Sequence, residues 1–393
     1  MKILTINTKY NEGGAAKIAN NIHNYINNNT DNNSLFVYAR NNCSDETYKK
    51  IQTELLKYTY ATYFRIFGKD KSVNLNNIYN DIDTADIVHI HNLHGYYINY
   101  KQIIEYLIKK DKKIVWTLHD TWILTGRCAV PNRCEKWREG CRECNDRNIY
   151  PKSIRKNYNK ELLYKKNLIN RINPENIIFV TPSKWLKDVI KSSYLNKFNV
   201  VSIGNGINKR VINKNYDQLR NDLGLPMDKK IILFVSGNMN DELKGIKFIK
   251  YIIENIDRDD ILFVSIGNVN KSLKFDNLFQ FGYINDEEKM SQIYKIADLF
   301  VNPSMGETFS LTTAEALSQG TKVVAFDIGP AKELINNSNG VLVEPFNEKM
   351  LLEVVESQVD INDYKIFDIN NINSEDDMCK KYMDIYYELL HKK

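Results

Sequence analysis

Short apolar runs rich in Ile and Val alternate along this chain with longer amphipathic stretches. Compact apolar runs are typical of buried strands, and apolar residues at three- and four-residue spacing are typical of helices. Their regular alternation predicts repeated βαβ units and a mainly parallel sheet, so the fold class is α/β. In the first half we expect strands at Lys2–Asn7, Leu35–Ala39, Ile87–Ile90, Lys113–Thr117, Ile177–Val180 and Val200–Ile203.

The second half repeats this pattern after a polar stretch, Asn208–Lys230. Its expected strands are Ile231–Val235, Ile261–Ile266, Leu278–Phe281, Leu299–Val301, Lys322–Phe326 and Val341–Val343. Each half therefore predicts its own doubly wound sheet, with residues 1–205 and 206–375 as the two domains and 376–393 as a terminal packing helix. Two such domains facing each other would place a central cleft at the carboxyl ends of both sets of strands, where open α/β sheets bind ligands.

Other segments are assigned from periodicity and composition. The pattern predicts a helix at Trp185–Lys191 and basic, aromatic helices within Tyr48–Lys71 and Lys152–Arg171. The Asn-rich patches Asn27–Asn33 and Asn370–Asn373 are expected to be loops.

The composition excludes several classes of protein. The 393 residues are 43% hydrophobic and 26% charged, which is ordinary for globular domains, and no apolar run is long enough to span a bilayer. A net charge of +5 over this length does not indicate a nucleic-acid partner. The N-terminus favours a first strand over a signal peptide, so we expect a cytoplasmic protein.

Two glutamates dominate the candidate chemistry of the second half. Glu307 and Glu315 flank the point where the strand at Leu299–Val301 ends and a helix begins near Thr312. Free N–H groups at Leu311–Thr313 would suit a diphosphate, and the two carboxylates could accept hydrogen bonds from sugar hydroxyls. The alternative is that Glu307 caps the helix and Glu315 is a solvated helix residue.

Four further features stand at expected strand ends. Gly13-Gly14 follows the first strand, His119-Asp120 follows Lys113–Thr117, Asn205-Gly206 ends the first half, and Lys244-Gly245 follows Ile231–Val235. Read singly, these are an ordinary turn, a buried histidine, a hinge and a surface lysine. A metal site at His89, His91 and His94 is incomplete because no nearby carboxylate or cysteine set accompanies it.

Taken in order, these five features resemble retaining nucleotide-sugar glycosyltransferases with the GT-B fold, specifically family 4 (glycosyl transferases group 1), of the cell-surface polysaccharide type. The resemblance covers nearly the whole chain and implies an acceptor-side domain 1–205, a nucleotide-sugar-binding domain 206–375, and no catalytic metal. It implies catalytic roles for His119, Glu307 and Lys244, and acceptor-side roles for Gly13, Gly14 and Asp120. The implied donor-binding residues are Gly14, Asn205, Lys244, Glu307, Phe309, Ser310, Leu311, Thr312 and Glu315.

The chain departs from the family pattern in two places. Gly237-Asn238-Met239 occupies the loop where relatives often carry an Arg as a second diphosphate contact. Ser310 stands where many members carry Gly.

A cysteine cluster lies in the segment 121–150: Cys128, Cys134, Cys141 and Cys144. A structural zinc, free buried thiols and disulfides are all open interpretations. The resemblance implies that this loop shapes the acceptor site.

We therefore expect transfer of a sugar from a nucleotide diphosphate sugar to a hydroxyl of a glycan or lipid-linked oligosaccharide, with retention of configuration. The basic aromatic stretches predict either peripheral contact with the inner membrane surface or solvated faces covering a core stripe. The alternative functions are a nucleotide-sugar 2-epimerase and an inactive relative that binds a glycan or a partner.

Overall fold

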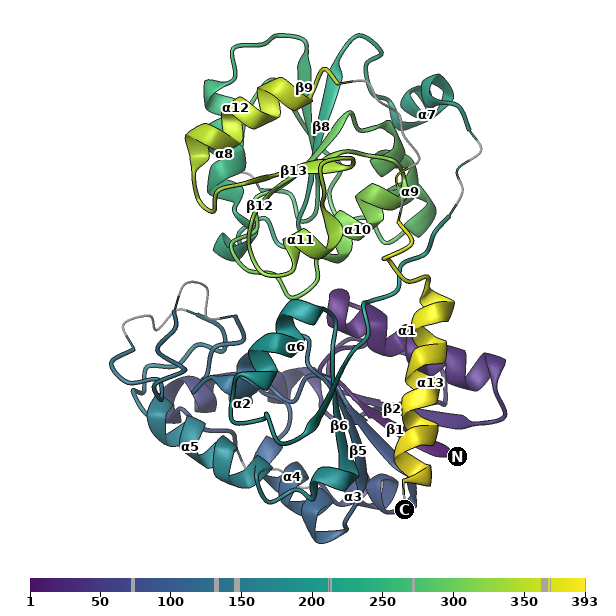
Figure 1. The fold of residues 1–393 in the computed structure, drawn as a ribbon, viewed down its shortest axis with the longest axis vertical. Coiled ribbons are helices and arrows are strands. Elements are labelled where there is room, and N and C mark those ends of the chain that lie inside the picture. Colours follow the sequence, from purple (N-terminus) through teal and green to yellow (C-terminus); the bar gives the residue numbers. More distant parts are fainter. Residues whose placement is uncertain are drawn as a thin grey trace. The chain divides into compact units, whose positions relative to one another are not determined.

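The chain divides into two units, each built on one sheet (Figure 1). The computed structural model describes all residues except 72–74, 131–133, 145–148, 211, 213, 271–272, 362–366, 368 and 393. Unit 1 comprises Met1–Gly206 and Glu375–Lys393, and unit 2 comprises Ile207–Ser374. The C-terminal segment therefore returns to the first unit.

Unit 1 contains a parallel sheet with strand order β3-β2-β1-β4-β5-β6-β7 over the residues described. Its strands are β1 (Lys2–Ile6), β2 (Asn33–Tyr38), β3 (Tyr48–Lys50), β4 (Ile87–Ile90), β5 (Lys113–Thr117), β6 (Ile177–Thr181) and β7 (Asn199–Ser202). All residues of β4 and β6 are buried, as expected for central strands covered on both faces. The order reverses between β1 and β4, and this is the topological switch point of the sheet.

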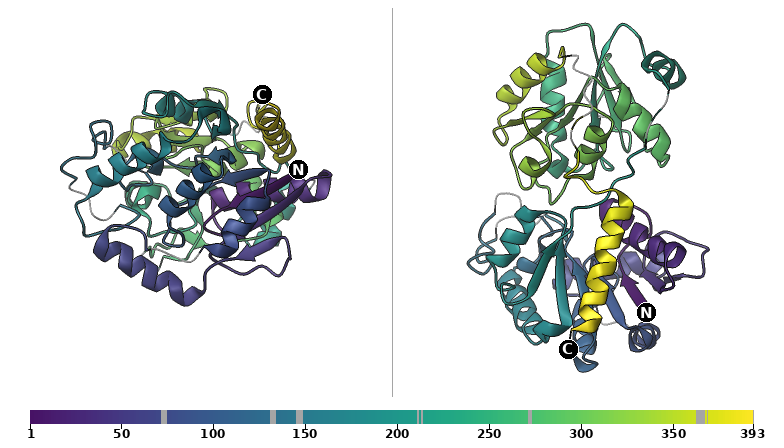
Figure 2. Two further views of the ribbon diagram at one scale, coloured as in Figure 1. Left: turned by 90° about the horizontal axis from the view of Figure 1, so that it is seen from below. Right: turned by 45° about the vertical axis from the view of Figure 1, so that its right-hand side comes forward.

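Helices cover both faces of the unit 1 sheet. They are α1 (Gly14–Asn29), α2 (Glu54–Phe67), α3 (Asn76–Thr84), α4 (Tyr100–Lys109), α5 (Tyr158–Ile169), α6 (Lys184–Lys191) and α13 (Glu375–His391), with 3-10 turns η1 (Trp122–Leu124) and η2 (Pro174–Asn176). Figure 2 shows α13 lying along the sheet of unit 1, and it packs beside α1. Helices α3, α4 and α6 contribute to the apolar core on the other face.

Two buried tyrosines attach α13 to unit 1. The Tyr386 hydroxyl lies 2.7 Å from Nδ1 of His89, and the Tyr382 hydroxyl lies 3.0 Å from Oγ1 of Thr117. Thr117 Oγ1 is in turn 2.8 Å from His89 Nε2. This network satisfies both ring nitrogens of a fully buried histidine, as buried polar groups require.

Unit 2 has the strand order β10-β9-β8-β11-β12-β13, with its switch point between β8 and β11. The strands are β8 (Lys230–Val235), β9 (Ile261–Ile266), β10 (Leu278–Gln280), β11 (Leu299–Asn302), β12 (Val323–Phe326) and β13 (Gly340–Val343). Alternate residues of β8 enter opposite cores: Ile231 and Leu233 pack in one, and Ile232 and Phe234 in the other. This explains why the strand is apolar along its buried length.

The helices of unit 2 are α7 (Tyr216–Leu223), α8 (Ile246–Asn255), α9 (Glu287–Ile296), α10 (Leu311–Ser318), α11 (Ala331–Leu334) and α12 (Glu348–Gln358), with a 3-10 turn η3 (Glu242–Lys244). Side chains of Asn215, Asp286 and Asn347 cap the N-termini of α7, α9 and α12. These caps satisfy first-turn N–H groups that have no partner within a helix. Within the part of the chain that the structure describes, no helix is long and apolar enough to cross a membrane.

The α/β class and both sheets are confirmed, and every strand expected from the sequence is present within a residue or two of its expected bounds. Two local expectations are wrong. Tyr48–Lys71 begins with strand β3 before α2, and Asn27–Asn29 belong to α1. Asn27 stays helical because its side chain bonds the backbone N–H and C=O of Ser34 at 2.7 and 3.1 Å.

Candidate functional site

The candidate donor site of unit 2 lies at the carboxyl ends of β8 and β11. The loop after β8 carries η3 and Lys244, and the loop after β11 carries Glu307 and leads into α10. Since β8 and β11 are neighbours at the switch point, these loops flank the crevice where such sheets bind ligands.

Lys244 and Glu307 form an ion pair at this edge. Nζ of Lys244 lies 2.8 Å from Oε1 of Glu307, and the two side chains are 37% and 18% exposed. The Glu307 carboxylate raises the pKa of Lys244 against the opposing effect of burial. Lys244 therefore carries a full positive charge at neutral pH, next to a carboxylate that is partly withdrawn from water.

A close backbone contact fixes the two loops against each other. Gly245 adopts φ +70°, and a Cβ at this position would lie 1.9 Å from the backbone oxygen of Pro303. Met305 N donates to the Leu243 oxygen at 2.7 Å. The glycine is thus required both for its left-handed backbone and for the approach that places Lys244 beside Glu307.

Ser310 is the last residue of the loop between β11 and α10, and its backbone is strained. It has φ +74° and ψ 79°, a left-handed conformation that is uncommon for residues other than glycine. Its hydroxyl lies 2.9 Å from both the Asn302 amide nitrogen and the Thr313 hydroxyl. The serine that stands in place of glycine is therefore compensated by side-chain hydrogen bonds rather than by a change of backbone.

The same hydroxyl does not cap α10. Ser310 occupies the N-cap position, but its side chain accepts no hydrogen bond from a first-turn N–H. Helix α10 thus differs from α7, α9 and α12, whose first turns are capped by side chains. Its N-terminus therefore offers backbone N–H donors and the positive end of the helix dipole to an anionic ligand.

A pocket of about 290 Å³, including its open mouth, lies beside this helix start. Glu307, Phe309 and Ser310 line it, and Phe309 is only 7% exposed because it also packs into the core. Glu315 lies one turn into α10 and is not among the described residues lining this pocket; its carboxylate accepts from the buried Tyr294 hydroxyl at 3.3 Å. Leu311 and Thr312 are half-buried in the first turn.

In unit 1, histidines gather at the carboxyl ends of β4 and β5. His91 Nδ1 lies 2.8 Å from His119 Nε2, with the two rings stacked. His94 Nε2 lies 2.6 Å from Oδ2 of Asp120, whose Oδ1 accepts from Trp122 N at 2.9 Å. A pocket of about 220 Å³ is lined by the three histidines and Asp120.

The surroundings of this cluster favour neutral imidazoles at His91 and His119. Loss of hydration lowers the pKa of His119 to about 4 and that of His91 well below its usual value. Burial alone would raise the pKa of Asp120, but His94 holds that pKa below its usual value. His119 is therefore uncharged at neutral pH and suited to donate or accept a single hydrogen bond.

The other residues chosen from the sequence lie as follows. Gly13 and Gly14 are exposed at the start of α1, where Gly13 has φ +86° and a Cβ added to it would meet no atom within 4 Å. Asn205 is 6% exposed and immediately precedes Gly206, the last residue of the first stretch of unit 1.

The cysteine segment 121–150 includes 131–133 and 145–148, which lie outside the described residues. Cys128, Cys134, Cys141 and Cys144 are all free thiols, and Cys141 Sγ accepts from Gly126 N at 3.1 Å. Across the described residues, no group of three or more His, Cys, Asp or Glu side chains is placed to hold a metal ion. The zinc interpretation of the cysteines therefore has no support, and neither has a metal at His89, His91 and His94.

Sequence reasoning missed several side chains that build these sites. Asn302 and Thr313 hold the loop before α10, and His91 and His94 orient His119 and Asp120. From the sequence, the histidines near β4 were considered only as a metal site, and that site was judged incomplete. The available signal was that His91 and His94 follow β4, the strand that pairs with β5, because His119 follows β5.

Comparisons with known proteins agree with this architecture. Residues 229–359 match the family model described as glycosyl transferases group 1. WcaC of Escherichia coli K12, whose name gives it a provisional role as a colanic acid biosynthesis glycosyl transferase, is 26% identical over 374 residues, covering 91% of this chain and 90% of WcaC.

Two solved structures share the fold over nearly the whole chain. Sucrose-phosphate synthase from Thermosynechococcus elongatus has a TM-score of 0.71 at 15% identity, covering 99% of this chain and 98% of that one. Anabaena HepE, solved in complex with UDP and glucose, has a TM-score of 0.67 at 14% identity, covering 98% and 99%. The chain thus has the two Rossmann-like domains of the GT-B fold, and the family match together with WcaC supports a glycosyltransferase.

Proposed function

We propose that this protein is a retaining glycosyltransferase that moves a sugar from a nucleotide diphosphate sugar to a hydroxyl of a glycan or lipid-linked oligosaccharide in surface polysaccharide biosynthesis. The observation that carries the proposal is the Lys244–Glu307 ion pair beside the uncapped N-terminus of α10. A charged amine, a carboxylate and free backbone donors match the parts of a nucleotide diphosphate sugar.

In this proposal Lys244 and the first turn of α10 bind the diphosphate. Both are positive, so together they neutralise the charge that grows on the leaving nucleotide as the sugar departs. This arrangement assigns to protein groups the role that a metal ion fills elsewhere, and the proposal includes no catalytic metal. Glu307 accepts hydrogen bonds from the donor sugar, and Glu315 from the ribose.

The reaction breaks the bond between the anomeric carbon and the diphosphate oxygen and forms a bond from that carbon to the acceptor oxygen. Because Glu307 is held by Lys244, we assign it to sugar hydroxyls and not to attack on the anomeric carbon. The acceptor then approaches from the side that the diphosphate leaves, and its proton passes to the departing phosphate oxygen. His119, neutral at pH 7, binds a hydroxyl of the reacting sugar.

The proposed setting follows from the relatives. WcaC carries a colanic acid biosynthesis name and matches this chain over most of its length. We extend surface polysaccharide biosynthesis to this chain and propose a growing surface glycan in the cytoplasm as its acceptor.

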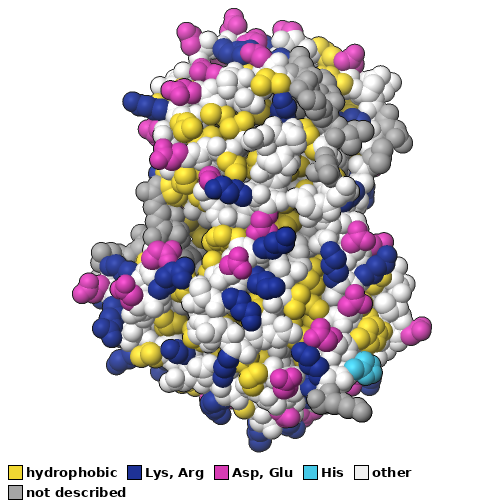
Figure 3. Space-filling view, viewed as in Figure 1, with side chains coloured by type: hydrophobic (Ala, Val, Ile, Leu, Met, Phe, Trp, Pro, Cys, Tyr) yellow, Lys and Arg dark blue, Asp and Glu magenta, His cyan; other side chains and the backbone are white. Residues whose placement is uncertain are grey.

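Exposed apolar side chains on unit 1 support peripheral membrane contact. On α2, Tyr58 is 66% exposed, and Ile66 and Phe67 are 43% and 46% exposed. In the segment before α5, Ile154 is 63% exposed. Figure 3 shows Lys and Arg side chains distributed over the face of unit 1 that carries α5 and α6. Arg65, Lys69 and Lys71, next to Ile66 and Phe67 in the sequence, are also exposed, and apolar groups beside cations suit an anionic lipid surface. Sedimentation with vesicles containing phosphatidylglycerol, compared with phosphatidylcholine vesicles, tests this contact.

Product stereochemistry tests the proposed reaction. Proton NMR of a reaction with common UDP, GDP and ADP sugars distinguishes retained from inverted anomers through the coupling of the anomeric proton. We expect an α-linked donor to give an α product, and Glu307→Gln to abolish it. Glu353→Gln, an exposed glutamate on α12, is the matched control and should leave the product unchanged. An inverted product, or a free sugar epimerised at C2, would contradict the proposal.

A further inference from the structure

In the Lys244–Glu307 ion pair, each side chain depends on the other. Nζ of Lys244 lies 2.8 Å from Oε1 of Glu307, and among the described residues neither side chain makes another hydrogen bond or ion pair. A ligand that draws Lys244 away therefore leaves the Glu307 carboxylate without a donor from the described protein.

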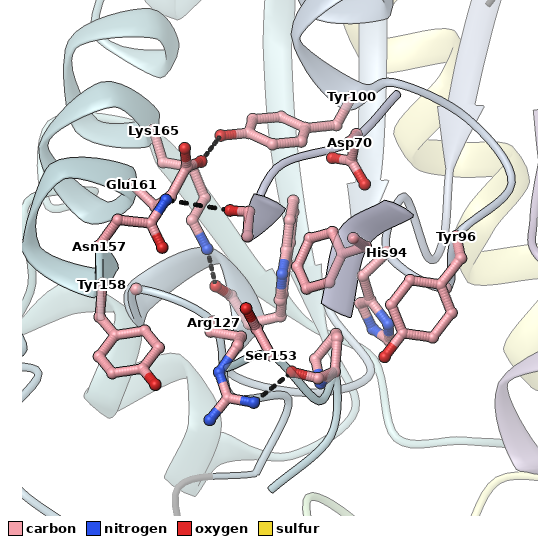
Figure 4. A pocket seen from close by; sticks show the side chains of 16 residues that line it. Asp70, His94, Tyr96, Tyr100, Arg127, Ser153, Asn157, Tyr158, Glu161 and Lys165 are labelled. Carbon is pink, nitrogen blue, oxygen red and sulfur yellow. Dashed lines mark hydrogen bonds between the residues drawn. The ribbon is translucent and has the colours of Figure 1, made fainter. Parts of the chain in front are cut away.

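A carboxylate of equal exposure in unit 1 shows the contrast. The Glu161 side chain on α5 is 18% exposed, as that of Glu307 is, but it accepts from both Lys101 Nζ at 3.1 Å and the Tyr100 hydroxyl at 3.3 Å. Figure 4 shows the Tyr100 hydroxyl directed at Glu161. Loss of either contact would leave Glu161 with a donor. Loss of Lys244 would instead leave Glu307 unpaired and only partly hydrated, which costs free energy.

The backbone holds the two loops of the pair together. Met305 N donates to the Leu243 oxygen at 2.7 Å, and Gly245 packs directly against the backbone of the loop after β11. Both contacts lie within two residues of a member of the pair in the sequence. The spacing of Lys244 and Glu307 is therefore set before a ligand binds, and the loops do not separate to give each charge a place of its own.

A nucleoside diphosphate competes with Glu307 for the same cation. An ammonium group has three donors, so Lys244 can turn to the phosphates or be shared between them and the carboxylate. In the first case Glu307 loses its partner, and in the second two anions lie beside one cation and repel each other. Both cases weaken the binding of a diphosphate that offers Glu307 nothing in return.

A sugar attached to the diphosphate removes this penalty. Sugar hydroxyls donate hydrogen bonds, and an ionised carboxylate only accepts them, so the hydroxyls replace Lys244 as partners of Glu307. The Glu307 side chain remains partly exposed beside Ser310 at the start of α10, so a hydroxyl can reach it without entering an enclosed cavity. The ribose does not take this role, because the proposed function places it at Glu315.

We propose that Glu307 selects the intact sugar nucleotide over the free nucleoside diphosphate, because its ion pair with Lys244 opposes a diphosphate that carries no sugar. The inference rests on the proposed function for the position of the diphosphate at Lys244, and it adds a role in product release. When the sugar leaves, Glu307 loses its hydroxyl donors and pairs with Lys244 again. The return of this pair weakens the binding of the product nucleotide.

Isothermal titration calorimetry on the full chain, without acceptor, tests this selection. The ligands are UDP, GDP and ADP, and UDP-glucose, UDP-N-acetylglucosamine, GDP-mannose and ADP-glucose. We expect at least one sugar conjugate to bind the wild type more tightly than its free diphosphate does. Glu307→Gln removes the competing charge, so it should bind the free diphosphate about fivefold more tightly than the wild type, with no such gain for the sugar conjugate.

Three further variants separate the ion pair from a general effect of charge. Glu242→Gln is the matched control, because Glu242 is an exposed glutamate on η3, two residues from Lys244 in the sequence, and both of its affinities should equal those of the wild type. Glu307→Asp keeps a charge on a shorter side chain and should give a smaller gain than Glu307→Gln. In a Lys244→Ala background the gain from Glu307→Gln should shrink, because no pair remains to be broken.

Four results would overturn the inference. They are no gain for the free diphosphate in both Glu307→Gln and Glu307→Asp, the same gain in Glu242→Gln, an undiminished gain in the Lys244→Ala background, and no sugar conjugate that binds the wild type more tightly than its diphosphate. Failure of the proposed function is a different result: no nucleotide binds, or Lys244→Ala leaves binding unchanged, and the selection then fails with it. Binding that depends on Lys244 but shows no gain in the Glu307 variants contradicts the selection alone.

Discussion

Replacing Gly245 with Ala should disrupt the candidate donor site through one backbone contact. The new Cβ would lie 1.9 Å from the Pro303 oxygen, a separation that no relaxation of a side chain can relieve. One of the two loops must therefore move. The Met305 N–H···Leu243 hydrogen bond and the Lys244–Glu307 pair both depend on the present spacing.

The chain contains a matched control for this change. Gly224 has φ +69° against +70° at Gly245, lies in the same unit, and has no atom within 4 Å of its Cβ position. Gly224→Ala therefore measures the cost of alanine in a left-handed backbone alone, about 1–2 kcal/mol. Gly245→Ala carries that cost and in addition the clash, which we place at about 1–3 kcal/mol by analogy with overpacked cores.

Urea denaturation followed by far-UV circular dichroism gives the free energies of unfolding. Tryptophan fluorescence would not serve, because all four tryptophans lie in unit 1. Hydrogen exchange read by mass spectrometry adds a local measurement, and the Met305 amide should exchange faster in Gly245→Ala than in Gly224→Ala. Equal losses of stability in the two variants, with unchanged exchange at Met305, would show that the loops are not fixed by this contact.

Three other changes should have measurable effects. Ser310→Gly should be more stable than Ser310→Ala by about 1–2 kcal/mol in urea denaturation, because both lose the hydroxyl but only glycine relieves the left-handed backbone; equal stabilities would contradict that conformation. Tyr386→Phe should cost about 1–3 kcal/mol and speed hydrogen exchange in α13, because buried His89 loses its partner; wild-type exchange would contradict the contact. Since the pKa of His119 falls from 6.5 to about 4 on folding, the unfolded chain binds more protons in that window, and stability should fall as pH drops from 6.5 towards 4. Tryptophan fluorescence of urea unfolding reports this for unit 1, and a flat profile would contradict it.

Much of the fold could be predicted because its central strands are buried on both faces. Such strands are mostly apolar, so Ile87–Ile90, Lys113–Thr117 and Ile261–Ile266 are predicted with their observed bounds. Strand β3 was not predicted from the sequence. It is a three-residue edge strand, Tyr48–Lys50, that pairs only with β2 among the described strands, and two of its residues are lysines. Composition also misassigned Asn27, whose helical place depends on a contact with Ser34.

The candidate sites were harder to predict from the sequence than the fold. Glu307 and Lys244 could each be chosen from their position after a strand, but they are 63 residues apart, and it is the pairing of β8 with β11 that joins them. Asn302 and Thr313, which contact the Ser310 hydroxyl, carried no signal of this role in the sequence. Their contact depends on the fold, which brings the end of β11 beside the first turn of α10.

The proposed function requires that unit 2 hold a nucleotide diphosphate through Lys244. Isothermal titration calorimetry with UDP, GDP and ADP measures this binding, using the wild type, Lys244→Ala, and Lys250→Ala as an exposed control lysine on α8. We predict that one nucleotide binds, that Lys244→Ala weakens it about tenfold or more through loss of a charge-assisted contact, and that Lys250→Ala binds as the wild type does. Binding of no nucleotide, or equal affinity in Lys244→Ala and the wild type, would contradict a donor site at Lys244.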